Sequence, residues 1–144
     1  MSAERVAVVL FQLGGPDSTE AVEPFLYNLF CDPDIIDFPG AFLARKPLAR
    51  FIASRRSGRV AAHYDEIGGK SPILELTNAQ AAALKDALAP HADVGVFVAM
   101  RYWKPFTADA ARSIREGGFG RVFLLPLSTA RALMFEAKLL CIDE

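Results

Sequence analysis

Three apolar runs without polar alternation constrain the fold of this chain most. They cover residues 5–13, 93–100 and 121–127 and consist mainly of aliphatic and aromatic side chains. Such a run suits a strand that is buried on both faces, which is the usual environment of a parallel strand. Long segments with helical patterns separate the runs, and parallel strands need connections of that length. The sequence therefore predicts an α/β fold with a parallel sheet, helices on both faces and right-handed connections.

Caps and breaks predict the helices of the first half of the chain. Residues 17–20 offer a capping residue with Glu three positions on, so a helix should begin there and end near Cys31. Its inward positions are predicted to be Ala21, Val22, Phe25, Leu26 and Leu29. Pro39 and Pro47 interrupt the next stretch, so we expect short helical pieces over 35–56 rather than one helix.

Three more helices are predicted farther along the chain. One covers 57–67 and ends at two glycines, which supply a left-handed C-terminal turn. The next begins at Ser71 or Thr77. The last covers 107–116, with Thr107 as its cap.

Composition excludes several classes of protein. Among 144 residues, 52% are hydrophobic and 23% are charged, which excludes a disordered or fibrous chain. The net charge of −1 gives no electrostatic reason to expect a nucleic-acid partner. Two cysteines are too few for a disulfide framework and favour the reducing cytoplasm. No apolar segment approaches the ~20 residues that span a bilayer, so we expect a soluble protein or one attached to a membrane surface.

Ligands of parallel sheets lie beyond the carboxyl ends of the strands. That rule selects the loops 12–17 and 101–107 and the segment after Leu127. In the first loop, Gly14 and Gly15 allow a backbone to approach a ligand closely, but the dinucleotide spacing and the P-loop lysine are missing. A tight turn is therefore favoured over a phosphate cradle.

Arg101 is followed by Tyr102 and Trp103 in the second loop. A cation beside two large aromatic rings suits a flat anionic ligand, with the guanidinium on a carboxylate and the rings stacked on the ligand. An arginine paired with a local acid, with the aromatic rings closing the sheet end, explains the same pattern. Both interpretations stay open at this point.

An apolar and basic segment precedes Arg55 and Arg56, with Tyr64 eight residues beyond. Its members are Phe42, Leu43, Arg45, Lys46, Leu48, Arg50, Phe51 and Ile52. An amphipathic flap of this kind could collect a hydrophobic ligand with carboxylates or touch a membrane surface. A solvated helix face is the alternative.

The two histidines, His63 and His91, have no second ligand at metal-binding spacing. A structural or solvent-facing role is favoured for both, and no metal site is expected. No set of residues resembling a Ser-His-Asp or Cys-His arrangement can be assembled from the sequence.

Three long motifs, at residues 13–36, 54–81 and 100–106, closely resemble the N-terminal half of ferrochelatase. That family inserts ferrous iron into protoporphyrin IX to give protoheme, a lyase reaction of heme and porphyrin biosynthesis. The resemblance implies two similar doubly wound α/β domains with the porphyrin cleft between them. This chain would be one of the two, in residues 1–127, followed by a divergent tail at 128–144. We expect a truncated or frame-shifted product, or a fragment.

The resemblance also implies a set of porphyrin contacts. Leu13 would line the macrocycle, Phe30 would belong to the lip of the pocket, and Ser71 lies in a family signature. The positions that contact the porphyrin and its propionates, or form the cleft floor, would be Arg55, Arg56, Val60, Tyr64, Arg101 and Tyr102. The catalytic histidine and its acidic partner belong to the other half, so no catalytic residue is expected here.

We therefore expect a chain that binds protoporphyrin IX and has little or no chelatase activity alone. A non-catalytic porphyrin-binding module and a chelatase for another tetrapyrrole are the alternatives. No tightly bound cofactor is expected, and two cysteines cannot supply the four ligands of an iron–sulfur cluster. We expect a cytoplasmic protein, with a peripheral membrane contact through residues 30–52 left open. The sequence indicates no oligomeric state.

Overall fold

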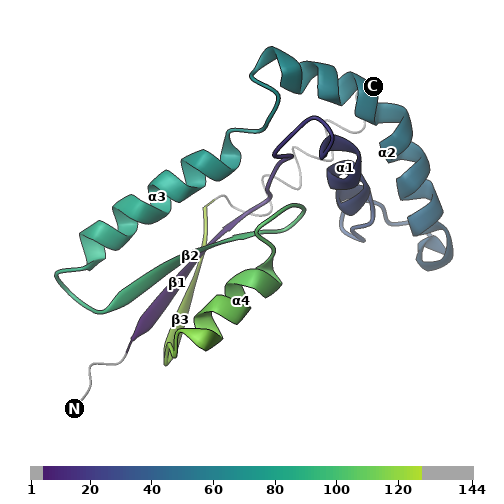
Figure 1. The fold of residues 1–144 in the computed structure, drawn as a ribbon. Helices are drawn as coiled ribbons and strands as arrows, with labels where there is room; N and C mark the ends of the chain where they lie inside the picture. The colour runs from purple at the N-terminus through teal and green to yellow at the C-terminus, as the bar shows by residue number, and fades with distance from the viewer. Residues whose placement is uncertain (1–4, 128–144) are drawn as a thin grey trace. The chain divides into compact units, whose positions relative to one another are not determined.

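The computed structural model describes residues 5–127, which form three strands and four helices (Figure 1). Their order is β1 (Val6–Gln12), α1 (Val22–Phe30), α2 (Ala41–Glu66), α3 (Ile73–Leu88), β2 (Val94–Met100), α4 (Thr107–Glu116) and β3 (Arg121–Pro126). The described residues divide into two compact units: 5–14 with 72–127, and 15–71. The tail predicted at 128–144 lies outside the described residues, and a domain boundary at 127 stays a prediction.

The first unit contains a parallel sheet in the order β2-β1-β3, so β1 is the central strand. Val6 pairs with Val94 on one side and with Arg121 on the other, and both ladders are parallel. The carboxyl ends of all three strands therefore lie at the same edge. The predicted α/β fold with a parallel sheet is confirmed.

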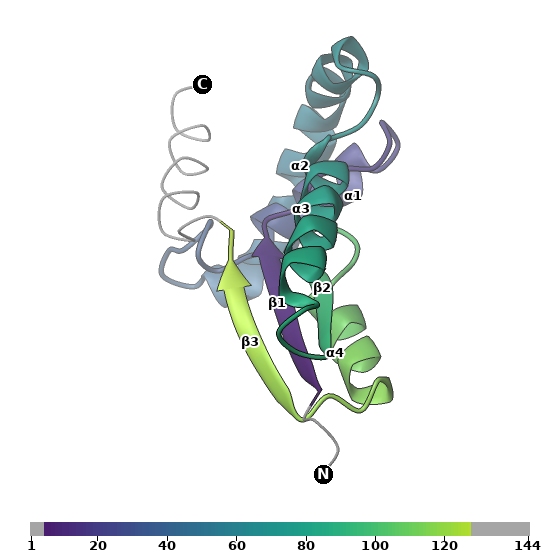
Figure 2. The same ribbon diagram turned by 90° about the vertical axis from the view of Figure 1, so that its left-hand side faces the viewer.

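Helices cover both faces of this sheet (Figure 2). On one face Val8 and Leu10 of β1 pack with Ala81 of α3. On the other face Val9 packs with Ala110 of α4. Successive residues of a strand point to opposite faces, so β1 needs apolar side chains on both faces, and residues 6–11 supply them.

β3 departs from the expected burial on both faces. All of its residues are exposed, including the four apolar positions Val122, Phe123, Leu124 and Leu125. β3 is one of the two edge strands, and the helices of this unit pack mainly on β1 and on β2, the other edge strand.

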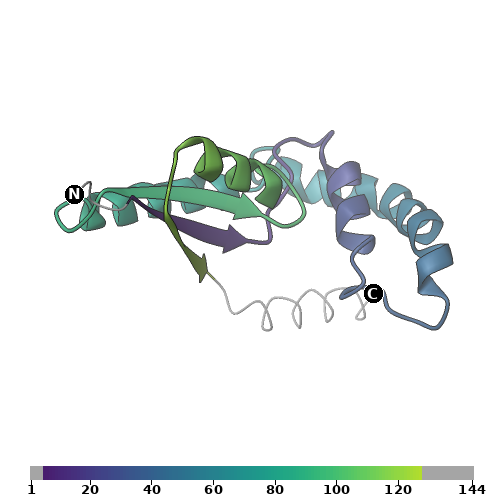
Figure 3. The same cartoon turned by 90° about the horizontal axis from the view of Figure 1, so that it is seen from below.

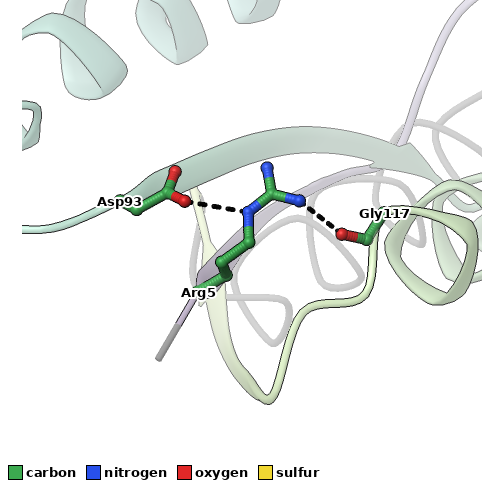
Figure 4. A network of polar contacts seen from close by, with 3 residues as sticks. All are labelled: Arg5, Asp93 and Gly117. Carbon is green, nitrogen blue, oxygen red and sulfur yellow. Dashed lines mark hydrogen bonds and ion pairs between the residues drawn. The ribbon is translucent and has the colours of Figure 1, made fainter. Parts of the chain in front are cut away.

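Arg5 links the segments at the amino ends of the three strands (Figure 4). Its Nε donates a hydrogen bond to the Asp93 carboxylate at 2.9 Å, and the guanidinium also donates to the Gly117 carbonyl. The guanidinium carbon lies 4.5 Å from the centroid of the Phe119 ring. One side chain thus connects the start of β1 to the segments that precede β2 and β3.

In the second unit α1 packs beside α2 (Figure 3). The buried core consists of Val22, Leu26 and Phe30 from α1 with Ala49 and Ala53 from α2. α1 begins slightly later than predicted, because the Ser18 hydroxyl accepts a hydrogen bond from the Ala21 N–H in the turn before it. Val22 and Leu26 are buried as predicted, whereas Phe25 and Leu29 are only partly buried.

The prediction of short helical pieces over 35–56 is wrong, because α2 is one helix of 26 residues that passes through Pro47. Proline removes the hydrogen bond to the carbonyl four residues earlier. That carbonyl belongs to Leu43, which is exposed, so water can satisfy it. Packing of Ala49 and Ala53 against α1 holds the helix together on its other side.

The separate helix predicted over 57–67 is also wrong, because residues 57–66 continue α2, but its predicted end and the other helix boundaries agree with the sequence. Gly68 and Gly69 both have positive φ after α2, as the predicted C-terminal turn requires. α3 begins at Ile73, so the start near Ser71 is confirmed, and Thr77 instead lies inside the helix and donates to the Ile73 carbonyl at 2.6 Å. α4 has the predicted bounds, but the residue that precedes its first turn is Phe106 rather than Thr107.

Within residues 5–127, no helix is both long and apolar enough to cross a membrane.

Candidate functional site

Gly14 makes a tight turn where β1 ends. Its φ is +90°, a conformation that side-chain-bearing residues rarely adopt. A Cβ at this position would lie 3.1 Å from the Met100 Cβ and 3.3 Å from the Trp103 backbone nitrogen. The turn therefore lets the loop after β1 approach the loop after β2 closely, which supports the tight-turn interpretation.

Backbone hydrogen bonds continue the pairing of β1 and β2 into these two loops. The Arg101 N–H donates to the Gln12 carbonyl at 3.0 Å, and the Tyr102 N–H donates to the Leu13 carbonyl at 2.9 Å. Three predicted site residues of the first unit, Leu13, Arg101 and Tyr102, are thus brought together.

The side chains of this group differ in exposure. Tyr102 is only 3% exposed, while Arg101 is exposed and its guanidinium carbon lies 5.5 Å from the centroid of the Tyr102 ring. A cation over an aromatic face is an attractive arrangement. The loop therefore presents a charged group supported by a buried ring.

Trp103 is a candidate that the predicted site set omitted. The side chain is 9% exposed, and its indole N–H has no hydrogen-bond partner among residues 5–127. A buried donor without a partner costs about 1–3 kcal/mol, so a ligand atom that accepts from it would gain affinity. Its place directly after Arg101 and Tyr102 was the only signal in the sequence.

In the second unit, one face of α2 carries three of the other six predicted residues. We define the inner face of α2 as Ala53, Arg56, Val60 and Tyr64, which follow one another at helical spacing and, apart from Arg56, belong to or pack against the core that α1 and α2 share. The Arg56 guanidinium carbon lies 5.9 Å from the centroid of the buried Phe30 ring. The structure thus brings Phe30, Arg56, Val60 and Tyr64 together.

Ser71 joins this group through Tyr64. Burial raises the pKa of the Tyr64 phenol above its ordinary value of 10.0, and a hydrogen bond with the Ser71 side chain partly offsets that rise. The Ser71 N–H donates to the Pro16 carbonyl at 2.8 Å, which holds the residue in place. At neutral pH this phenol is uncharged and can both donate and accept a hydrogen bond.

Arg55 lies apart from Arg56 although the two are adjacent in sequence. Its side chain is exposed, and its guanidinium carbon lies 5.5 Å from the centroid of the Phe51 ring. Neighbouring helical residues are about 100° apart around the axis, since 3.6 residues make one turn. The porphyrin contact that the resemblance implies for Arg55 stays a prediction, while its separation from the inner face predicts that Arg56 is the anchor and that loss of Arg55 matters little.

The titratable metal-ligating side chains are scattered. His63 on α2 and His91 after α3 are both exposed. Within the described part of the chain, no three His, Cys, Asp or Glu side chains come together in a way that could hold a metal ion. Cys31 is half-buried beside α1, and Cys141 lies outside the described residues.

Known proteins resemble this chain over most of its length. A family model of ferrochelatase matches residues 5–134. The chain belongs to the ferrochelatase family. The ferrochelatase of Geotalea daltonii is 54% identical over 125 residues, which are 87% of this chain and 38% of that protein.

Ferrochelatases of other organisms are also similar to this chain. The protein of Gloeobacter violaceus is 50% identical over 124 residues, covering 85% of this chain and 38% of the relative. The chloroplastic ferrochelatase-2 of Cucumis sativus is 46% identical over 126 residues, covering 86% of this chain and 24% of the relative. The chain thus spans less than two fifths of the length of the ferrochelatases it matches, and the resemblance seen in its three motifs is confirmed.

Proposed function

We propose that this chain supplies a porphyrin-binding part of a ferrochelatase that inserts ferrous iron into protoporphyrin IX. The observation that carries the proposal is the inner face of α2, where one cation, aliphatic and aromatic side chains and a neutral phenol lie together. A porphyrin is a flat apolar disc with two carboxylates. Its site needs apolar walls and a few basic anchors.

Each residue of the second unit has a chemical role in this proposal. Arg56, supported by the Phe30 ring, binds a propionate through charge-assisted hydrogen bonds. Val60 offers apolar surface to the macrocycle. Tyr64, held by Ser71, offers a neutral hydrogen-bonding group whose raised pKa keeps it protonated.

The first unit contributes a second group of proposed porphyrin contacts. Arg101 is the cation there, and the buried Tyr102 ring supports its guanidinium. Leu13 offers apolar surface beside them. Variants of this group and of the inner face can be tested independently.

Iron insertion requires two pyrrole N–H protons to leave the ring as the metal enters. A basic group must therefore reach the ring nitrogens, and the walls must favour a bent ring over a flat one. We propose that the family's histidine and its acidic partner provide this base outside the chain. His63 and His91 are not assigned to the role. Ferrous iron and protoporphyrin IX are substrates, and no tightly bound cofactor or iron–sulfur cluster is proposed.

Absorbance titration of the full chain with protoporphyrin IX tests the proposal. We expect saturable binding that Arg101→Ala weakens, whereas Arg112→Ala, an exposed arginine near Asp109 on α4, leaves it unchanged. Binding that is indifferent to Arg101, or absent, would contradict the proposal. Iron insertion by the same protein is measured as the loss of porphyrin fluorescence and should be weak or undetectable. Turnover like that of a full-length ferrochelatase would refute the proposal that this chain binds the porphyrin without supplying the base.

A non-catalytic porphyrin-binding module is the second candidate, favoured by a cation and aromatic rings gathered on the inner face without an assigned base. Adding the remaining length of a ferrochelatase as a separate chain distinguishes the two. Restored iron insertion supports the enzyme, and binding without insertion supports the module. A chelatase for another tetrapyrrole predicts tighter binding of that ring than of protoporphyrin IX.

For location we propose the cytoplasm, with a peripheral membrane contact through residues 30–52. The support is the exposed apolar side chains in the first half of α2. Flotation with liposomes tests the contact, and a protein that stays at the bottom of the gradient would refute it.

A further inference from the structure

One edge of β3 has no partner strand among residues 5–127, where β3 pairs only with β1. Its four apolar side chains are between 43% and 66% exposed. Edge strands are usually protected by charged side chains, by proline or by a covering segment, because their unpaired peptide groups can pair with another chain. In β3 only Arg121 at the start and Pro126 at the end offer such protection. The residues between them therefore form a candidate interaction surface.

The hydrogen bonds to β1 show which peptide groups of β3 are left for a partner. The Leu127 N–H donates to the Phe11 carbonyl of β1 at 3.1 Å. Alternate residues of a strand direct their peptide groups to opposite sides, so the odd-numbered residues of β3 face β1. The N–H and C=O groups of Val122 and Leu124 therefore point away from β1. Pro126 points the same way but has no N–H to donate.

The side chains of β3 are apolar on both faces of the sheet. Val122 and Leu124 line a groove of about 290 Å³ together with Ile114 of α4. Phe123 and Leu125 lie on the opposite face, because the side chains of a strand alternate. A strand that pairs with this edge would thus meet apolar side chains on both of its own faces.

We propose that β3 pairs with β3 of a second copy of this chain, antiparallel about a two-fold axis, so that one sheet continues across the dimer. A two-fold interface uses the same surface of both copies, and that surface must be complementary to itself. When the pairing is centred on Phe123, Val122 of each copy exchanges two N–H···O=C bonds with Leu124 of the other. Every outward N–H and C=O of these two residues is then satisfied. This inference goes beyond the proposed function and does not depend on porphyrin binding.

Pro126 favours this register over the alternative that is centred on Leu124. In that alternative the Val122 carbonyl would face Pro126 of the second copy, which has no N–H to donate. In the register centred on Phe123, Val122 and Leu124 of the two copies are opposite each other on one face. The two Phe123 rings meet on the other face. Aromatic and aliphatic pairs across neighbouring strands stabilise a sheet.

Charge favours a second copy over other occupants of this edge. Arg121 lies opposite Leu125 of the second copy in this register, so the pairing brings no like charges together. The net charge of the chain is −1, and a charge near zero promotes association between copies. A nucleic acid would find a single cation in β3, whereas its affinity requires several phosphate contacts.

Light scattering of the full chain over a series of concentrations tests for the dimer. We expect the mass to rise from one copy to two and to stop there, because each copy uses its one free β3 edge. Leu124→Lys should weaken dimerisation at least about tenfold, since lysine opposes pairing at an edge. Leu76→Lys on α3, where the leucine is 61% exposed compared with 66% for Leu124, should leave it unchanged. Val122→Pro removes an outward N–H, spares the bonds to β1 and should also prevent dimerisation.

Cysteine variants test the register in a protein that also carries Cys31→Ser and Cys141→Ser. Facing residues of a pair without hydrogen bonds have Cα atoms about 4.5 Å apart, which a disulfide can span. Phe123→Cys should therefore link two copies on oxidation. Leu125→Cys is on the same face but lies opposite Arg121 of the second copy, so it should not.

Each contrary result overturns a defined part of the proposal, with circular dichroism to establish that the variants are folded. A chain that stays monomeric, or a mass that rises beyond two copies, overturns the dimer. A dimer that is indifferent to Leu124→Lys and Val122→Pro overturns its assignment to β3. Disulfide formation by Leu125→Cys and not by Phe123→Cys overturns the register.

The remaining length of a ferrochelatase, added as a separate chain, tests the competing partner. If the chain alone is monomeric but binds this partner through Leu124, the edge belongs to the partner and the proposal is overturned. Protoporphyrin titration of Leu124→Lys is expected to match the wild type. Failure of the dimer is therefore distinguishable from failure of the porphyrin proposal.

Discussion

Residues of one helix, α2, lie in opposite surroundings. On the inner face, Ala53, Val60 and Tyr64 are packed on the core around α1, and Arg56 is supported by Phe30. Elsewhere on the same helix, in its first half, large apolar side chains are exposed. Arg55 and Arg56 are neighbours in sequence, yet their guanidinium groups stack on different rings. The two arginines are the same residue type, so their surroundings alone distinguish the proposed porphyrin anchor Arg56 from the exposed Arg55.

Replacing a leucine by alanine at a buried and at an exposed position of the second unit should give the largest difference in the free energy of unfolding. Leu26 is buried in the core between α1 and α2, whereas Leu43 is exposed. Leu26→Ala should lower the free energy of unfolding by about 2–5 kcal/mol, because it removes buried methyl groups and leaves a cavity. Leu43→Ala should change it by roughly 0.5 kcal/mol or less. Urea unfolding measures both, and equal losses would contradict the burial of Leu26 and the exposure of Leu43.

Two glycine substitutions should act in opposite directions. Gly14→Ala places a Cβ at positive φ and close to Met100, so we expect a loss of about 1–3 kcal/mol in the free energy of unfolding. Gly58 lies inside α2, and a Cβ there would meet nothing within 4 Å. Gly58→Ala should therefore stabilise the protein by about 0.5–1 kcal/mol. A destabilised Gly58→Ala protein would show that α2 is not the continuous helix on which the inner face depends.

The ionisation of Tyr64 gives the smallest of these effects. Its pKa is raised above 10.0 in the folded protein, mainly by burial. The resulting contribution to stability is present in full below pH 10.0 and is lost as the pH rises through the folded-state pKa. Between pH 10.0 and the raised folded-state pKa, the free energy of unfolding should therefore fall more steeply in the wild type than in Tyr64→Phe. Urea unfolding across this pH range measures the slopes, and identical slopes would place Tyr64 in a more exposed environment.

Much of the fold could be predicted from the sequence. The bounds of β1, β2 and β3 are within one residue of the apolar runs that predicted them, and α4 has its predicted bounds. These elements are delimited by uninterrupted apolar residues or by glycine and proline, which are local signals. The exposure of β3 could not be predicted in this way, because a run of apolar residues does not say which strand forms the edge of a sheet.

The continuity of α2 and the split between Arg55 and Arg56 depend on packing. Pro47 is a local signal for a break, but Ala49 and Ala53 pack on α1 and keep the helix intact. Helical periodicity alone places Arg55 and Arg56 in different directions. It does not say which of them is directed toward α1, and that required the position of Phe30.

The most direct test of the inner face as a porphyrin site compares these two arginines. Protoporphyrin IX is titrated by absorbance into the wild type, Arg56→Ala and Arg55→Ala, with circular dichroism to establish that each variant is folded. The Arg56→Ala variant should bind protoporphyrin IX about tenfold or more weakly, because it loses charge-assisted hydrogen bonds to a propionate. The affinity of Arg55→Ala should stay close to that of the wild type. Equal weakening by both variants, or none by Arg56→Ala, would contradict the account.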